Sequence, residues 1–133
     1  MTRKGETMNA SAATDSVRIR GVVDYNAIDW RRVDHTVRRL QARIVKAQQQ
    51  GRYGKVKSLS RVLTRSFAAR AMAVRRVTSN RGKRTPGVDG QRWTTAAEKA
   101  QAIESLRPER YKAKPLRRVY IPKSNGKRRP LGI

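Results

Sequence analysis

The residues of this chain best suited to chemistry are the lysines and arginines within 114–133. Two short apolar runs flank Asn125-Gly126, a pair that tolerates the positive φ of a hairpin turn. Pro122 and Pro130 cannot donate to a β ladder, which favours an exposed ribbon. We predict a basic β-hairpin that binds phosphate, because its cations face no acid and exceed what protection of a sheet edge needs. The alternative is a solvated ribbon. The cations are Lys114, Arg117, Arg118, Lys123, Lys127, Arg128 and Arg129.

The composition indicates a partner of opposite charge. The chain has 133 residues, enough for one small domain with a modest core, and a formal net charge of +24. Such a chain repels itself unless a polyanion neutralises it, so nucleic acid is the expected partner. An anionic membrane surface is the weaker alternative, because no basic amphipathic segment carries bulky aromatics on its apolar side.

The rare residues exclude several kinds of site. Cysteine is absent and His35 is the single histidine, so there is no disulfide framework or thiolate metal site, and we expect no metal ligands. No apolar run is long enough to span a bilayer, and residues 1–16 lack the apolar centre of a secretory signal. The sequence therefore predicts a cytoplasmic protein with no membrane partner.

Hydrophobic spacing predicts a pair of helices within residues 24–80. Asn26 or Asp29 can cap the first helix, and Gly51 ends it. A second helix is predicted over about 55–79, and the short linker favours an antiparallel helical hairpin. Apolar residues at spacings of three and four form the facing stripes, with Leu40 and Phe67 expected in the core: Trp30, Val33, Val37, Leu40, Ile44 and Ala47, then Val56, Leu59, Leu63, Phe67, Ala71, Val74 and Val77.

The charges of this helical hairpin are almost all positive. From His35 to Val88 there is no acidic residue, against fifteen Lys and Arg. A merely soluble hairpin would mix signs on its surface, although Arg-rich flanks are often only a solvated face. We predict that cations here and on the β-hairpin bind nucleic acid: Arg38, Arg39, Arg43, Arg61, Arg65, Arg75, Arg76, Lys83, Arg84, Arg117, Arg118, Lys127 and Arg128.

The remaining segments complete the expected organisation. Residues 1–23 are polar and predict a flexible leader. Residues 81–113 combine a glycine-rich loop without regular structure and a third helix, which a capping box of Thr95 and Glu98 opens. The loop lacks the Gly-Lys-Ser/Thr of a P-loop. Together with the β-hairpin, these segments predict an α+β fold whose core is not evidently complete.

Three motifs in order are specific enough to indicate a family. They are Thr-Pro-Gly-Val-Asp-Gly at 85–90, Ile-Pro-Lys at 121–123 and Arg-Pro-Leu-Gly-Ile at 129–133. From about Tyr25 to Ile133, the chain resembles the N-terminal part of group II intron-encoded reverse transcriptase/maturases. Those enzymes are RNA-directed DNA polymerases that also help their intron RNA fold, splice and move.

The resemblance implies roles for individual segments. It implies an N-terminal extension joined to the start of the fingers subdomain, truncated before the palm. The helical hairpin would bind group II intron RNA or template RNA, and the loop at 82–90 would lie near the template and primer. Lys123 and Arg129 match two fingers cations that contact the triphosphate of the incoming nucleotide. A lysine point charge and an arginine fork suit that chemistry.

The chemistry of polymerisation is expected elsewhere. The palm of such an enzyme binds metal through aspartates, typically in a Tyr-Ala-Asp-Asp motif, and no such motif occurs here. Asp89 and the distant Glu98 cannot build a two-metal site. We therefore expect no catalytic residues, no cofactor and no activity in this chain alone; Mg²⁺ and a partner palm and thumb are implied for the full-length enzyme. The alternatives are a stand-alone basic RNA-binding protein and a nonfunctional truncated remnant.

Overall fold

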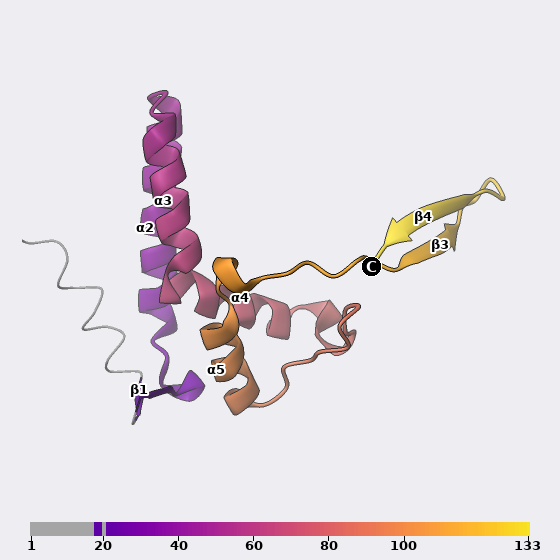
Figure 1. Cartoon of the computed structure of the whole chain (residues 1–133), viewed down its shortest axis with the longest axis horizontal. Helices are drawn as coiled ribbons and strands as arrows, with labels where there is room; N and C mark the ends of the chain where they lie inside the picture. The colour runs from indigo at the N-terminus through magenta and orange to yellow at the C-terminus, as the bar shows by residue number, and fades with distance from the viewer. Residues whose placement is uncertain (1–17, 20) are drawn as a thin grey trace, which may run out of the picture.

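The computed structural model describes residues 18–19 and 21–133. In these residues four α-helices combine with two separate two-stranded antiparallel sheets, so the fold class is α+β, as the sequence predicts (Figure 1). The elements in chain order are β1 (Arg18–Ile19), β2 (Val22–Val23), the 3₁₀ turn η1 (Tyr25–Ala27), α2 (Trp30–Gln49), α3 (Tyr53–Arg65), α4 (Phe67–Ser79), η2 (Arg81–Arg84), α5 (Ala96–Ser105), η3 (Pro108–Arg110), β3 (Arg118–Pro122) and β4 (Arg128–Gly132).

Helices α2 and α3 form the expected helical hairpin. The Asp29 carboxylate caps α2 by accepting hydrogen bonds from the backbone N–H groups of Arg31 and Arg32, both at 3.1 Å. Gly51, with φ of 65°, lets the chain reverse into α3, which lies alongside α2 (Figure 1). Leu59 of α3 is buried in this contact, whereas Leu40 of α2 is only partly buried.

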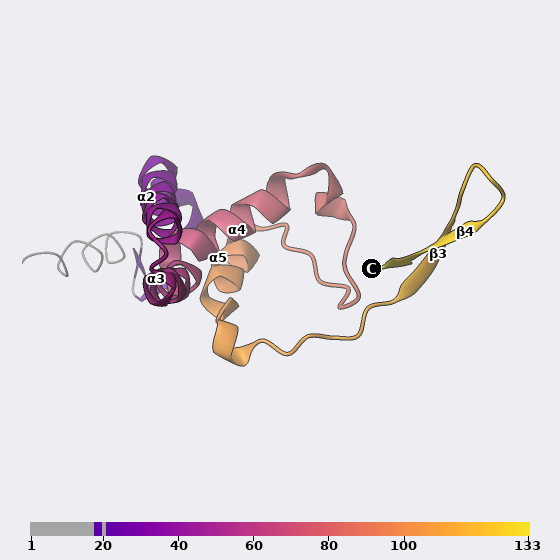
Figure 2. The same cartoon turned by 90° about the horizontal axis from the view of Figure 1, so that it is seen from above.

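The prediction of one helix over about 55–79 is wrong, because the structure has two helices there, α3 and α4. Ser66 is extended, with φ of −67° and ψ of 143°, and it separates α3 from α4. Its hydroxyl donates to the Leu63 carbonyl at 2.8 Å and accepts from the Ala69 N–H at 3.1 Å. A serine hydroxyl can replace helical backbone partners in this way, so at the bend it is hydrogen-bonded to both helices. Helix α4 then leaves at a steep angle to α3 (Figure 2).

Helix α4 lies at the centre of the core. Ala71 and Val74 of α4 and Ile103 of α5 have no exposed surface. Phe67, expected to hold the first two helices together, begins α4 and is partly buried against this cluster. The buried members of the cluster come from the N-terminal ribbon, the end of η1, α2, α4 and α5: Val23, Ile28, Val33, Val37, Ala68, Ala71, Val74, Ala100, Ala102 and Ile103.

The end of the predicted leader, Val22–Val23, is part of the fold. Residues 1–17 and 20 lie outside the described residues. Val22–Val23, expected at the end of the leader, pairs with Arg18–Ile19, and Val23 is 5% exposed. The apolar pair was predicted to be leader because its neighbours are polar, but one valine covers α5.

Helix α5 begins with the predicted capping box. The Thr95 hydroxyl accepts from the Glu98 N–H at 3.2 Å, and the Glu98 carboxylate accepts from the Thr95 N–H at 3.0 Å. The same carboxylate accepts from the N–H of Thr94 at 2.7 Å. The backbone N–H groups of Thr95 and then Thr94 lower the pKa of Glu98 to about 2, because they bind the charged form.

Strands β3 and β4 form the predicted β-hairpin, which extends away from the helices in both views (Figures 1 and 2). Gly126 adopts φ of 74° and donates its N–H to the Lys123 carbonyl at 3.1 Å. The Asn125 side chain accepts from the Lys127 N–H at 3.2 Å. Only Val119 of the two strands is even partly buried. The exposed ribbon indicated by its prolines is therefore confirmed.

Candidate nucleic-acid interface

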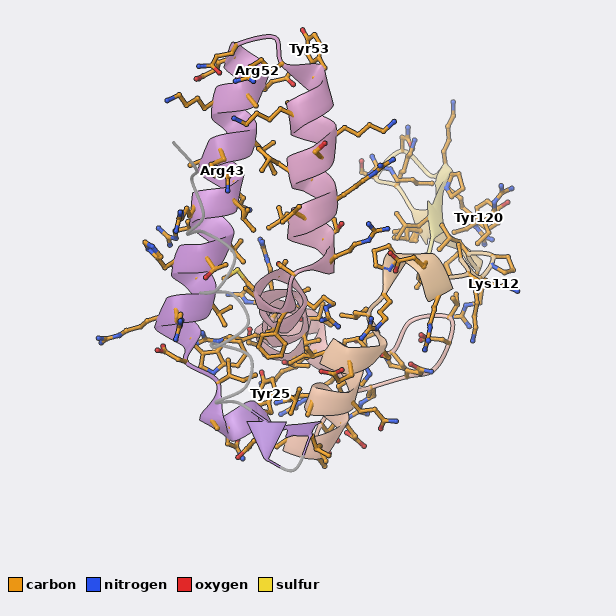
Figure 3. All side chains as sticks on the ribbon, turned by 60° about the vertical axis from the view of Figure 1, so that its left-hand side comes forward. Tyr25, Arg43, Arg52, Tyr53, Lys112 and Tyr120 are labelled. Atoms are coloured by element: carbon orange, nitrogen blue, oxygen red, sulfur yellow. The ribbon has the colours of Figure 1, made fainter. Side chains whose placement is uncertain are left out.

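The predicted nucleic-acid-binding side chains are all exposed, but they are not one continuous surface. On α2, Arg39 and Arg43 lie about a turn apart, off the stripe of buried valines. On α3, Arg61 and Arg65 are also one turn apart, and Lys57 precedes them at the same spacing. Figure 3 shows Arg43 on α2, with Arg52 and Tyr53 at the far end of the helical hairpin. The two long helices thus carry rows of cations along their exposed sides.

Several of the predicted cations, Arg39 among them, interact with other groups of the chain. The Nε atom of Arg38 lies 2.7 Å from an oxygen of Asp34, one helical turn earlier. The guanidinium of Arg75 lies 4.6 Å from the ring centroid of Trp30, a cation–π contact between α4 and the start of α2. Both interactions reduce what these arginines can offer a phosphate. Arg75 in particular stabilises the fold.

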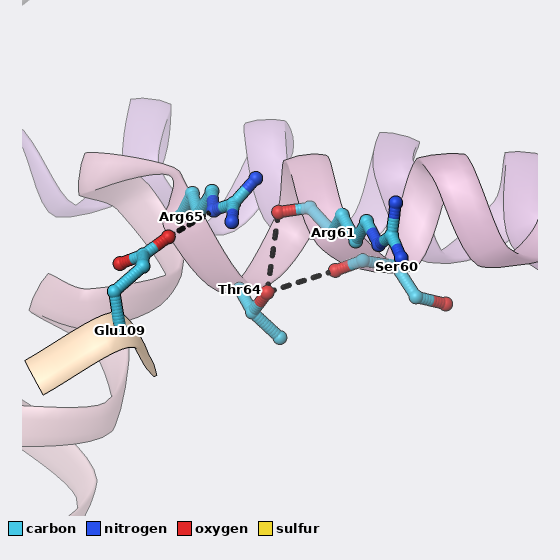
Figure 4. A network of polar contacts seen from close by, with 5 residues as sticks. All are labelled: Ser60, Arg61, Thr64, Arg65 and Glu109. Carbon is cyan, nitrogen blue, oxygen red and sulfur yellow. Dashed lines mark hydrogen bonds and ion pairs between the residues drawn. The ribbon is translucent and has the colours of Figure 1, made fainter. Parts of the chain in front are cut away.

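Another such cation is Arg65 (Figure 4). Its Nε atom donates to a carboxylate oxygen of Glu109 at 2.5 Å, which ties η3 to the end of α3. The N–H of Glu109 itself and then the Arg65 guanidinium hold the pKa of Glu109 below its ordinary value. Neighbouring Thr64 bonds only to its own helix, through the carbonyls of Ser60 and Arg61. Arg61 is therefore the arginine of α3 that is better placed for an external anion.

The glycine-rich loop is partly ordered, which corrects the prediction that it has no regular structure. Residues Arg81–Arg84 form the 3₁₀ turn η2. The Thr85 N–H closes this turn by donating a hydrogen bond to the Gly82 carbonyl at 3.0 Å. Lys83 lines a hollow of about 230 Å³ together with Asp89 and Trp93. Arg84 lies beside it in sequence but does not line this hollow. A single turn of 3₁₀ helix needs few residues, so neither glycines nor a nearby proline prevent it.

The β-hairpin brings the two predicted triphosphate-binding residues together. Ile121 pairs with Arg129, which places Arg129 one step from Lys123 on the same face, because side chains alternate along a strand. Lys123, Asn125 and Arg129 line one hollow of about 430 Å³ beside the turn. Arg118 and Arg128 lie on the opposite face by the same alternation. The register thus separates this pair of cations from Arg118 and Arg128, whereas Lys127, opposite Lys123, lies on the same face as the pair.

Sequence reasoning missed a further group of cations on the segment after α5. Arg107, Arg110 and Lys112 are exposed and lie along a groove that Trp93 and Tyr111 also line. The signal in the sequence is the run Arg-Pro-Glu-Arg-Tyr-Lys at 107–112, where cations alternate with an aromatic residue.

The part of the chain that the structure describes contains neither a cluster of metal-ligand side chains nor a helix that could span a membrane. Within residues 18–19 and 21–133, no three His, Asp or Glu side chains gather closely enough to hold a metal ion. In the same residues, no helix has both the length and the apolar character needed to cross a membrane.

Comparison with known proteins identifies the helical part of the chain. Residues 25–106, from η1 to the end of α5, match the family model of the N-terminal domain of reverse transcriptase, which covers more than half of the chain. The chain belongs to this family. A curated relative, Protein YkfC of Escherichia coli (strain K12), is 52% identical over 68 residues, which are 47% of this chain and 18% of that protein. The chain therefore spans only a small part of the relative's length.

Proposed function

We propose that this chain is the RNA-binding N-terminal extension and the start of the fingers of a group II intron reverse transcriptase/maturase. The observation that carries the proposal is the acid-free stretch from His35 to Val88, which the fold exposes as rows of cations in a reverse-transcriptase N-terminal domain. Such rows bind phosphates rather than base edges, so they recognise an RNA by its shape. The β-hairpin motifs support the assignment to group II introns.

In this proposal Lys123 and Arg129 bind the triphosphate of the incoming nucleotide. Their shared hollow beside the turn and the absence of acids from 114–133 both favour an anion there. The palm and thumb would supply Mg²⁺ and the chemical step, and the present residues would bind and orient. This chain alone is expected to bind RNA and not to extend a primer.

The proposed RNA binding is tested by a filter-binding titration of the 133-residue chain against group II intron RNA at several salt concentrations. Each neutralised phosphate contributes roughly −0.7 to −0.9 to the slope of log affinity against log salt. Arg43→Ala is expected to make the slope shallower by about one unit. Arg38→Ala is the matched control, because its ion pair with Asp34 lies on the same helix, and it is expected to change the slope much less.

A slope that does not respond to salt would contradict phosphate binding. An unrelated structured RNA of equal length tests the finer assignment. Equal affinity for both RNAs would favour the alternative of a general basic RNA-binding protein over a group II intron partner.

A further inference from the structure

A groove of about 950 Å³ lies between α4, the loop before α5 and the segment that follows α5. Leu63, Ala73 and Leu106 are among its apolar lining, and two aromatic residues face it from different segments. Trp93 is partly buried against the core, whereas Tyr111 is 76% exposed. Its size is that of sites that hold a small organic group.

The mouth of this groove is basic. Arg107, Arg110 and Lys112 line it with exposed side chains, and Lys112 is visible on the stretch between η3 and the β-hairpin (Figure 3). Asp89 is the acid among the lining residues, and its carboxylate accepts from the Gln91 N–H at 3.1 Å. The groove thus combines an apolar, aromatic floor with a rim that attracts anions.

Contacts within the chain hold the outer wall in place. Glu109, which stands among these cations in sequence, is turned to Arg65 of α3. The Arg110 N–H closes the turn η3 by donating a hydrogen bond to the Arg107 carbonyl at 3.1 Å. From α4, the Arg70 Nη1 atom donates to the Ile103 carbonyl at 2.7 Å, which fixes α4 against α5. The groove is therefore formed before any ligand arrives, which reduces the entropy lost on binding.

We propose that this groove binds an unpaired nucleotide of single-stranded RNA. The base would stack on Tyr111 and Trp93, and the phosphates on either side would lie against Arg107, Arg110 and Lys112. Aromatic stacking accepts any base, but it needs a free base face, which a duplex does not offer. The inference rests on the proposed function for the identity of the polyanion, but it uses residues that the proposed phosphate rows do not include.

The test uses the fluorescence of Trp93. In the full 133-residue chain, Trp30→Phe leaves Trp93 as the sole tryptophan. A 12-nucleotide oligouridylate is expected to quench this fluorescence, and an RNA duplex of equal length is expected to leave it unchanged. Tyr111→Ala is expected to lower the affinity for the oligouridylate by roughly five- to a hundredfold and to leave the affinity for the duplex within twofold.

Tyr53→Ala is the matched control. Tyr53 is 66% exposed and lies at the far end of the helical hairpin, so its loss should change neither the quenching nor the affinity for the oligouridylate. RNA that binds with a salt-dependent affinity but leaves Trp93 unquenched would overturn the groove and spare the proposed function. A chain that binds neither RNA would overturn both. Equal losses from Tyr111→Ala and Tyr53→Ala would also overturn the groove as the site.

Discussion

The helical body, residues 22–106, and the β3–β4 ribbon reach a defined shape by different means. The body has a core in which Ala71, Val74 and Ile103 are fully buried, and several of its charges have internal partners. The ribbon depends on backbone pairing and on its Asn125-Gly126 turn, and its side chains are exposed except for the half-buried Val119. A cation on the body can therefore serve the fold, as Arg75 does. A cation on the ribbon is placed only by register.

The largest expected effect tests this difference directly. Ile103→Ala removes a fully buried side chain from the body and should cost about 2–5 kcal/mol in the free energy of unfolding. Ile121→Ala removes the same side chain from the ribbon, where it is 44% exposed. Thermal denaturation followed by circular dichroism should show a large drop in Tm for the first variant and almost none for the second. Equal drops would mean that the ribbon packs against the body in solution.

The second prediction concerns the convergent cations of the ribbon. With this segment joined to a complete palm and thumb, Lys123→Ala and Arg129→Ala should each reduce nucleotide incorporation about ten- to a hundredfold, because a charged hydrogen bond is lost. Arg129→Lys should also be impaired, since a point charge cannot replace the guanidinium fork. RNA affinity, measured separately, should fall little.

Arg117→Ala is the control on the same face of the ribbon, at its other end. It is expected to weaken RNA binding more than incorporation. If all of these variants lose RNA affinity equally and incorporation only follows that loss, the ribbon is an RNA clamp without a triphosphate site.

Local signals made several elements predictable. The capping box of Thr95 and Glu98, the Asp29 cap and the Asn125-Gly126 turn each act within a few residues, so the sequence contains their full physical cause. The break at Ser66 was missed because the apolar stripe continues through it. Beyond the bend, α4 packs against α5, a contact between segments distant in the chain. Periodicity records which side chains are buried, and not the direction of the helix that buries them.

Contacts between distant segments limited prediction of the site. Arg65 was predicted only to bind RNA, because Glu109 lies 44 residues away in the chain. The groove lined by Trp93 and Tyr111 is built from segments before and after α5, so no single motif describes it. Lys123 and Arg129, in contrast, line one hollow because a single tight turn joins their strands, and that turn is a local signal.

The smallest effect distinguishes the two regions by pH. The folded pKa of Glu98 is about 2, below its ordinary value of 4.5, because backbone N–H groups bind the carboxylate. Its stabilisation of the body is therefore fully present above about pH 4.5 and is lost as the pH falls toward 2. The ribbon segment, 114–133, has no acidic side chain and offers no such titration. By NMR, the amide resonances of Thr94 and Thr95 should shift with a midpoint near pH 2, whereas that of Lys127, bound to the Asn125 amide, should not move. In Glu98→Gln the shift of both threonine amides should disappear. A midpoint near 4.5 in the wild-type chain would mean that the capping box is open in solution.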